Sequence, residues 1–130
     1  GDLSRRTAAK WRIKMDSWFD SAKLGIFMHR GIYSVLEVTE SWSFFGGEIG
    51  YDAIHESAEG FTAAKYDPDE WGELFKKAGA RYTVLTSKHH DGIALWDTKT
   101  TDLNIVKKTP AKRDLIAPYC KAMREHGLKV

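Results

Sequence analysis

The sequence has few cysteines and no long apolar run, two features that would identify a disulfide-rich or a membrane protein. It contains one cysteine, Cys120, so no disulfide can form within the chain. A single cysteine fits either a reducing compartment or a secreted protein that needs no bridge. No run approaches the roughly 18 apolar residues of a membrane span, and the N-terminus, which begins at Gly1, lacks the apolar core of a signal peptide. We therefore expect a soluble protein with no membrane partner, bacterial-type cytoplasmic or exported, with its compartment left open.

An excess of charge of one sign is also missing. The 20 basic and 18 acidic residues are spread along the chain and leave a formal net charge of +2. Such a distribution provides no strong field to hold nucleic acid or an anionic membrane surface. The 130 residues are 42% hydrophobic and 29% charged, which is typical of one soluble globular domain over residues 1–130.

Apolar runs and amphipathic stretches alternate along the chain. The predicted elements are, in order, a helix at 7–19, a strand at 23–29, a helical turn at 51–59, a helix at 67–78, a strand at 82–89, a helix at 114–126 and the start of a strand at 128–130. Asp67 is the expected N-cap of the 67–78 helix, whose buried face is expected to carry Trp71, Leu74, Phe75 and Ala78. The connection between the first strand and this helix is unusually long and rich in glycine and aromatic residues, which is typical of a functional loop.

The alternation of strands and helices predicts an α/β fold with a parallel sheet. A doubly wound sheet and a (β/α)8 barrel both satisfy this order. Neither predicted strand is followed by the glycine-rich, phosphate-cradling patterns of doubly wound folds, which favours the barrel. A whole barrel needs eight strands and about 250 residues. The prediction is therefore a partial (β/α)8 barrel of two complete βα units plus the start of a third strand, completed by self-association into a homo-oligomer.

Histidines follow both predicted strands. His29 ends the first, whereas His89 and His90 end the second, so all three are expected at the carboxyl edge of the sheet, where barrel enzymes build their sites. Because neighbouring strands lie about 4.8 Å apart, one pocket can hold all three. Each histidine can instead bond only to backbone or to a carboxylate at the rim. A metal site is disfavoured because His89 and His90, as successive strand residues, point to opposite faces; no metal and no cofactor is expected.

Histidines and aromatic residues together favour a sugar ligand. A neutral imidazole offers one hydrogen-bond donor and one acceptor, as the hydroxyls of a polyol require, and Trp42 can cover the apolar side of a sugar ring. Trp42, Phe44 and Phe45 can equally belong to an ordinary loop core. Both interpretations remain open at this point.

Several short motifs resemble those of one enzyme family. They are Trp18-Phe19, Leu24-Gly-Ile-Phe-Met-His-Arg-Gly-Ile-Tyr-Ser-Val35, Glu40-Ser-Trp-Ser-Phe-Phe45, Tyr66-Asp-Pro-Asp-Glu-Trp71, Lys77-Ala-Gly-Ala-Arg-Tyr82, Lys88-His-His-Asp-Gly92, Leu95-Trp96 and Lys112-Arg-Asp-Leu115. Together they resemble the start of the retaining α-L-fucosidases of glycoside hydrolase family 29. The resemblance covers residues 18–130, and its Lys-His-His-Asp-Gly element is specific.

The resemblance implies how fucose would be bound. It implies that His29, His89 and His90 hydrogen-bond the hydroxyls of fucose, with Glu40 and Trp42 as further contacts from the first long loop. The sequence departs from the family at Ser41, which separates Glu40 and Trp42, two residue types that are usually adjacent in the family.

A second departure is Arg30, where the family generally has tryptophan. An arginine there brings a cation near the expected site, able to pair with a carboxylate or a charged substrate group. It can equally lie across an aromatic ring at a subunit contact. Arg30 is therefore included among the predicted substrate-binding residues.

The resemblance also bears on the two catalytic carboxylates that the family uses. A retaining glycosidase needs two carboxyl groups about 5 to 5.5 Å apart, and the family's nucleophile and acid/base correspond to positions beyond Val130. Within the chain the candidates are Asp91, Glu40, Glu48 and Asp97. One hypothesis is a retaining α-L-fucosidase, active only as an oligomer, acting on a fucosylated glycan or aryl fucoside. The alternative is a non-catalytic fucose-binding or truncated fragment.

Overall fold

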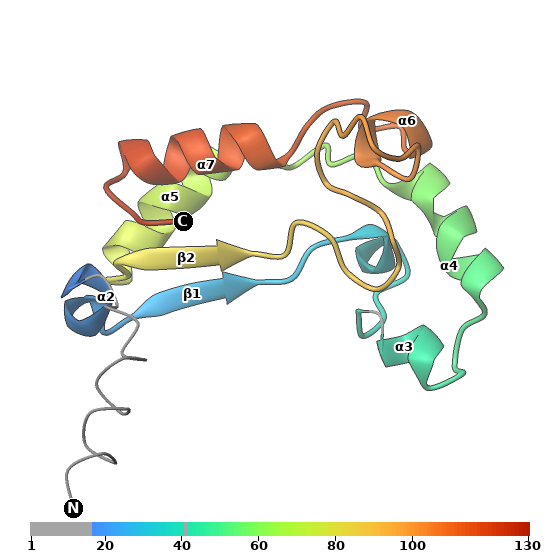
Figure 1. The fold of residues 1–130 in the computed structure, drawn as a ribbon, viewed down its shortest axis with the longest axis horizontal. Coiled ribbons are helices and arrows are strands. Elements are labelled where there is room, and N and C mark those ends of the chain that lie inside the picture. Colours follow the sequence, from blue (N-terminus) through green and yellow to red (C-terminus); the bar gives the residue numbers. More distant parts are fainter. Residues whose placement is uncertain (1–16, 41) are drawn as a thin grey trace, which may run out of the picture.

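The computed structural model describes residues 17–40 and 42–130. Most of the helix predicted at 7–19 lies outside the described residues, and its last positions belong to α2 (Ser17–Ala22). Figure 1 shows two adjacent strands with the longer helices on one side and a group of short helices beyond the ends of the strands. None of the described helices is long and apolar enough to cross a membrane.

The sheet consists of two parallel strands, β1 (Gly25–Met28) and β2 (Tyr82–Leu85), paired in register from Gly25 opposite Tyr82 to Met28 opposite Leu85. The predicted α/β arrangement with parallel strands is thereby confirmed. The backbone N–H of Thr83 donates to the carbonyl of Lys129 at 2.8 Å, so the chain returns beside β2 where a third strand was predicted to start. Closure into a barrel stays a prediction.

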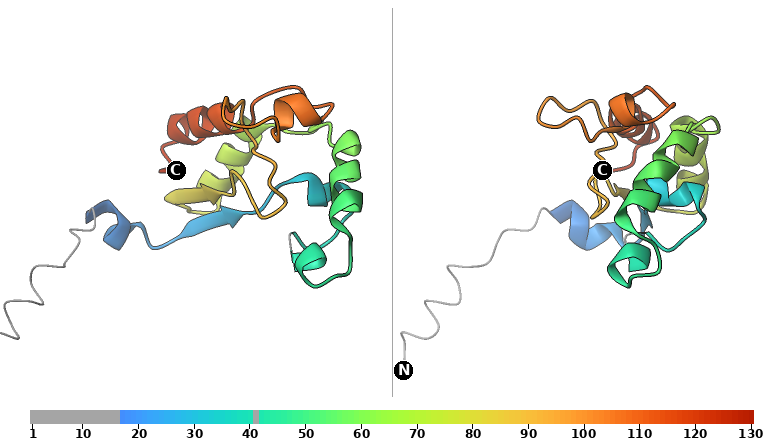
Figure 2. Two further views of the ribbon diagram at one scale, coloured as in Figure 1. Left: turned by 45° about the vertical axis from the view of Figure 1, so that its right-hand side comes forward. Right: turned by 90° about the vertical axis from the view of Figure 1, so that its right-hand side faces the viewer.

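Two ten-residue helices, α5 (Pro68–Lys77) and α7 (Ile116–Glu125), cover one face of this sheet (Figures 1 and 2). The predicted N-cap of α5 is confirmed, because the Asp67 carboxylate accepts the N–H groups of Asp69 and Glu70 at 3.0 and 3.1 Å. On α7, Pro118 lies in the first turn, where its missing N–H costs nothing.

The predicted buried face of α5 was partly wrong. Phe75 is buried, but Leu74 is 61% exposed and Ala78 is also exposed. Gly72 is buried and lies against His126, the residue that follows α7: a Cβ atom at position 72 would come within 2.5 Å of the His126 ring. Because a residue without a side chain allows the closest approach, the face that packs on α7 is centred on Gly72 rather than on Leu74.

Five short helices lie in the connections. They are η2 (Ile32–Val35), α3 (Trp42–Phe45), α4 (Tyr51–Glu56), η3 (Ser57–Gly60) and α6 (Ile105–Lys108). The helical turn predicted at 51–59 corresponds to α4 and η3. The sequence had predicted only a loop at α6, which begins where the Asn104 side chain accepts the N–H groups of Val106 and Lys107.

The two faces of the sheet differ in what covers them. Ile26, Met28 and Leu85 point toward the helices and pack against the hydrophobic core. On the opposite face Phe27 is 62% exposed and Val84 is 38% exposed. This alternation follows from the two-residue period of a strand, and it leaves one apolar sheet face open within the described part of the chain.

Candidate functional site

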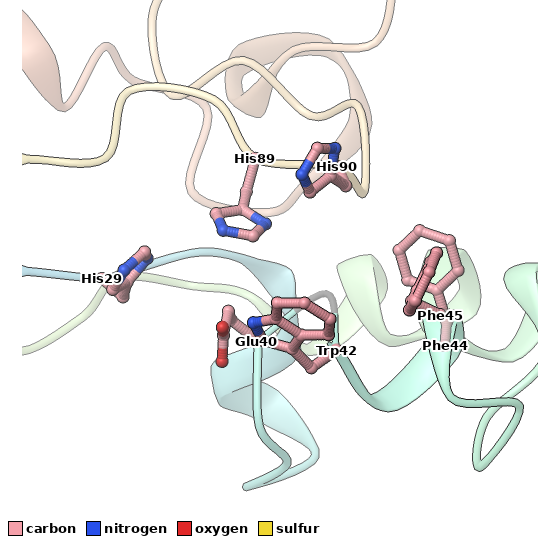
Figure 3. A pocket seen from close by; sticks show the side chains of 7 residues that line it. All are labelled: His29, Glu40, Trp42, Phe44, Phe45, His89 and His90. Atoms are coloured by element: carbon pink, nitrogen blue, oxygen red, sulfur yellow. The ribbon is translucent and has the colours of Figure 1, made fainter.

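A pocket of about 580 Å³ lies at the carboxyl ends of the two strands. It is lined by His29, Glu40, Trp42, Phe44, Phe45, His89 and His90 (Figure 3). The structure therefore brings together the three histidines, Glu40 and Trp42, which come from three separate segments of the chain.

His29 reaches the pocket because it continues the open face of β1. It lies two residues after Phe27, and its ring packs against that side chain with the centroids 5.0 Å apart. Its Nδ1 shares a hydrogen bond of 2.9 Å with the hydroxyl of Thr86, which follows β2. Thr86 thus fixes the orientation of the imidazole and leaves Nε2 for a ligand.

His89 and His90 stand on a tight turn beyond β2. The N–H of Gly92 donates to the carbonyl of His89 at 3.0 Å, and Gly92 has a φ of 83°, a conformation that favours glycine. Lys88 and Ala94 pair as an antiparallel bridge at the base of the turn. The rings of His89 and His90 are nearly perpendicular with centroids 5.0 Å apart, and His89 lies 5.2 Å from His29.

Asp91 stabilises this turn through a hydrogen bond of its buried side chain. Its side chain is 2% exposed, and its carboxylate accepts the N–H of Ile93 at 2.9 Å. Burial raises the pKa of Asp91, while the hydrogen bond from Ile93 and the nearby histidines act in the opposite direction. Its carboxylate is one of the four predicted catalytic candidates, but it does not line the pocket.

The other three carboxylate candidates are differently placed. Glu40 lines the pocket beside Trp42, as Figure 3 shows. Glu48 and Asp97 are exposed and do not line the pocket, and Asp97 lies 3.8 Å from the ammonium group of Lys99. Of the four, only Glu40 is positioned to reach a ligand in the pocket.

The aromatic residues of α3 divide between core and pocket. Phe44 is partly buried and packs against the hydrophobic core, whereas Trp42 is 63% and Phe45 78% exposed. Ser43 anchors the helix, because its buried hydroxyl donates to the carbonyl of Glu40 at 2.9 Å. Glu40 and Trp42 both line the pocket although Ser41 separates them in the sequence.

Arg30 points away from this pocket. Its guanidinium carbon lies 5.4 Å from the ring centroids of Tyr66 and Trp71 and 5.6 Å from that of Phe61, so it lies among three aromatic rings on the helix side of the sheet. Burial lowers the pKa of this guanidinium. Of the two alternatives for Arg30, the structure shows the contact with aromatic rings, and these rings belong to the same chain. Arg30 does not line the pocket.

Tyr33, which sequence analysis did not single out, lies beneath the pocket. It is 4% exposed, and its ring centroid is 6.1 Å from that of His89. Burial, together with the nearby charges of Asp91 and Glu40, raises the pKa of its phenol.

His55 is a second residue that the sequence did not reveal. It lies on α4, and its Nε2 is 2.9 Å from the carbonyl oxygen of Asp91, to which it donates. Its ring packs against Tyr51 with the centroids 4.1 Å apart. The spacing of four residues between Tyr51 and His55 indicated a shared helix face, but nothing in the sequence indicated that this face meets the turn of His89 and His90.

Replacing His55 is expected to loosen that turn. His55→Ala removes the donor to the Asp91 carbonyl, and a net loss of about 0.5–1.5 kcal/mol corresponds to amide hydrogen exchange about 2- to 10-fold faster at Gly92 and Ile93. His55→Gln, which keeps a donor, is expected to restore most of the protection. Exchange measured by NMR checks this, and unchanged rates in His55→Ala would show that the bond does not hold the turn.

Within residues 17–40 and 42–130, no group of three or more histidine, cysteine, aspartate or glutamate side chains is arranged to hold a metal ion. The residues that line the pocket offer imidazole, carboxylate and indole hydrogen-bonding groups together with aromatic rings.

Comparison with known proteins assigns the chain to a family. The family model described as alpha-L-fucosidase matches residues 4–130, nearly the whole chain. The chain belongs to the α-L-fucosidase family. Among curated relatives, an alpha-L-fucosidase of Branchiostoma floridae is 34% identical over 87% of this chain, and the tissue alpha-L-fucosidase of Mus musculus is 32% identical over 88%. This α-L-fucosidase family member spans 29% of the length of each.

Solved structures of α-L-fucosidases are similar as well. The Thermotoga maritima alpha-fucosidase in complex with fucose is 43% identical with a TM-score of 0.69, and the match covers 85% of this chain and 32% of that one. The alpha-L-fucosidase isoenzyme 1 of Paenibacillus thiaminolyticus is 38% identical with a TM-score of 0.80, covering 87% of this chain and 26% of that one. Both the sequence and the three-dimensional arrangement thus agree with the family resemblance found in the motifs.

Proposed function

We propose that this chain forms the fucose-binding part of an α-L-fucosidase, a glycoside hydrolase that removes terminal α-L-fucosyl groups from glycans or aryl fucosides. The observation that carries this proposal is the convergence of His29, His89, His90 and Glu40 on one pocket with Trp42 beside them. The similar Thermotoga maritima structure is a complex with fucose, which supports fucose as the ligand here.

The chemistry of these side chains suits a sugar. Each neutral imidazole can donate to one hydroxyl and accept from another, and the Glu40 carboxylate accepts from two. Trp42 offers an exposed face to the apolar side of the ring. Because Thr86 holds His29 and the turn holds His89, these groups are oriented before the ligand arrives, which lowers the cost of ordering them.

The proposed hydrolysis proceeds with retention through a covalent glycosyl intermediate. That mechanism needs two carboxyl groups about 5 to 5.5 Å apart, and of the four candidates only Glu40 lines the pocket. We assign Glu40 to binding, and the nucleophile and acid/base to carboxyl groups that do not line this pocket in the single chain. A second copy of the chain is one source, since the open sheet face with Phe27 and Val84 is apolar and suited to association.

A non-catalytic fucose-binding role is the second candidate. It is favoured by the positions of the candidate carboxylates, because three of the four do not line the pocket that the histidines line. The two functions share the binding site and differ in whether a bond is cleaved.

Calorimetry with L-fucose and turnover of an aryl α-L-fucoside test these functions together. Binding with hydrolysis, and with the α-anomer of fucose released first in an NMR time course, is the expected result for a retaining enzyme. Activity that rises faster than in proportion to chain concentration is expected for a homo-oligomer. Binding without hydrolysis would leave the second candidate, and the absence of fucose binding would overturn both.

A further inference from the structure

The two ends of the pocket differ in chemistry. His29, His89 and Glu40 stand at one end, and Phe44 and Phe45 stand at the other, with the indole of Trp42 between them (Figure 3). A volume of about 580 Å³ falls within the range of about 300–1,000 Å³ that is typical of pockets for drug-sized ligands. One sugar ring held by the histidines therefore leaves the aromatic end of the pocket unfilled.

Phe45 and Trp42 form two walls of this aromatic end. Their rings are 5.5 Å apart at an interplanar angle of 87°, and both are largely exposed, Phe45 at 78% and Trp42 at 63%. A single exposed phenylalanine is ordinary on a protein surface. Two perpendicular aromatic rings beside a polar ligand site are instead suited to pack against a second part of the same ligand, one that presents an apolar face.

The exposure of Phe45 is set by the local fold. Phe44 packs into the core and against Tyr51, with ring centroids 6.5 Å apart, and successive helical residues point about 100° apart, so Phe45 is turned outward. The carbonyl of Ser43 accepts the N–H groups of Glu48 and Ile49 at 2.9 and 3.2 Å. These bonds close the turn after α3 and hold the Phe45 ring at the mouth of the pocket.

We propose that Phe45, which stands beside the Trp42 ring that covers fucose, is the platform for the group attached to fucose: the apolar face of a second pyranose or the ring of an aromatic aglycone. The inference rests on the proposed function, since it requires fucose at the histidine end. Stacking on a carbon-rich face explains why this end offers rings and no charged group. Phe45 is thus a specificity-determining residue that acts on substituted fucosides and not on fucose itself.

Binding of three ligands separates these roles. L-fucose, a fucosyl-α-1,2-galactose disaccharide and 4-nitrophenyl α-L-fucoside are titrated against the full chain and against Phe45→Ala, with binding followed by saturation-transfer NMR before any turnover accumulates. Phe45→Ala is expected to weaken binding of the substituted fucosides by about 3- to 10-fold and to leave L-fucose within about 2-fold. Phe45→Trp, which keeps a ring, is expected to restore the affinity.

The control variant is Phe19→Ala, which removes a phenylalanine that is 44% exposed and does not line the pocket. It is expected to leave binding of all three ligands unchanged. A loss confined to the disaccharide would identify a sugar as the partner of Phe45, and a loss confined to the nitrophenyl ligand would identify an aromatic aglycone. Equal losses for L-fucose and the substituted fucosides, or no loss at all, would overturn the platform, whereas a wild-type chain that does not bind L-fucose would overturn the proposed function.

Discussion

The double variant His29→Ala/His89→Ala is expected to bind L-fucose about 10- to 100-fold more weakly than the wild-type chain. Each imidazole offers a hydrogen bond to a sugar hydroxyl, and each such bond contributes about 0.5–1.5 kcal/mol net. The two rings lie 5.2 Å apart and line the same pocket, so both are expected to reach one ligand. Isothermal titration calorimetry measures the difference.

A histidine outside the pocket provides the control for this experiment. The Nε2–H of His126, the residue that follows α7, donates a 2.7 Å hydrogen bond to the carboxylate of Asp69 on α5, and His126 does not line the pocket. His126→Ala is expected to keep fucose affinity within about 2-fold, since it removes an imidazole of the same size elsewhere. Equal affinities of the wild-type chain and the double variant would mean that the histidines do not bind the sugar.

Leu115→Ala is expected to lower the free energy of unfolding by about 2–5 kcal/mol. Leu115 is completely buried at the start of α7. Its N–H donates to the carbonyl of Leu95 at 3.0 Å, and its carbonyl accepts the hydroxyl of Tyr66 at 2.6 Å. Because both backbone groups are held, the site cannot collapse around the missing side chain, which places the expected loss in the upper half of that range.

Urea unfolding monitored by circular dichroism gives this free energy. Leu74→Ala is the matched control, because Leu74 is 61% exposed on α5 and its truncation is expected to cost less than about 1 kcal/mol. Similar losses for the two leucine variants would show that Leu115 is not part of the cooperative core.

The positions of the strands and of the histidines were predictable because they depend on local patterns. Apolar runs of strand length indicated β1 and β2, and polar residues that follow a strand lie near the edge of the sheet where that strand ends. The predicted end of the second strand was wrong, because β2 ends at Leu85 and His89 stands on the turn beyond it. The convergence of His29 and His89 follows once the strands are parallel and adjacent, as the structure shows. The placement of the histidines at this edge was therefore accessible from the strand pattern, whereas Glu40 was expected only from the family resemblance.

The supporting contacts were not predictable because they join residues distant in the chain. The partner of His55 is a backbone carbonyl 36 positions away, and every residue has such a carbonyl, so the sequence does not indicate which one His55 contacts. The buried face of α5 depends on Gly72 meeting His126, a contact set by the packing of two helices. The aromatic rings around Arg30 come from three positions between 61 and 71, and only the fold brings them to the end of β1.

Side chains along and just after β1 alternate between the face that leads to the pocket and the face that packs on the hydrophobic core. Phe27 and His29 belong to the open face, while Met28 and Arg30 belong to the face that packs on the helices. Inserting or deleting one residue in this strand would exchange the two faces, turning the Arg30 guanidinium toward the pocket and the His29 imidazole toward Trp71. Evolution can therefore alter this edge by substitution but not by changing its length, and relatives of different specificity are expected to keep the same spacing here.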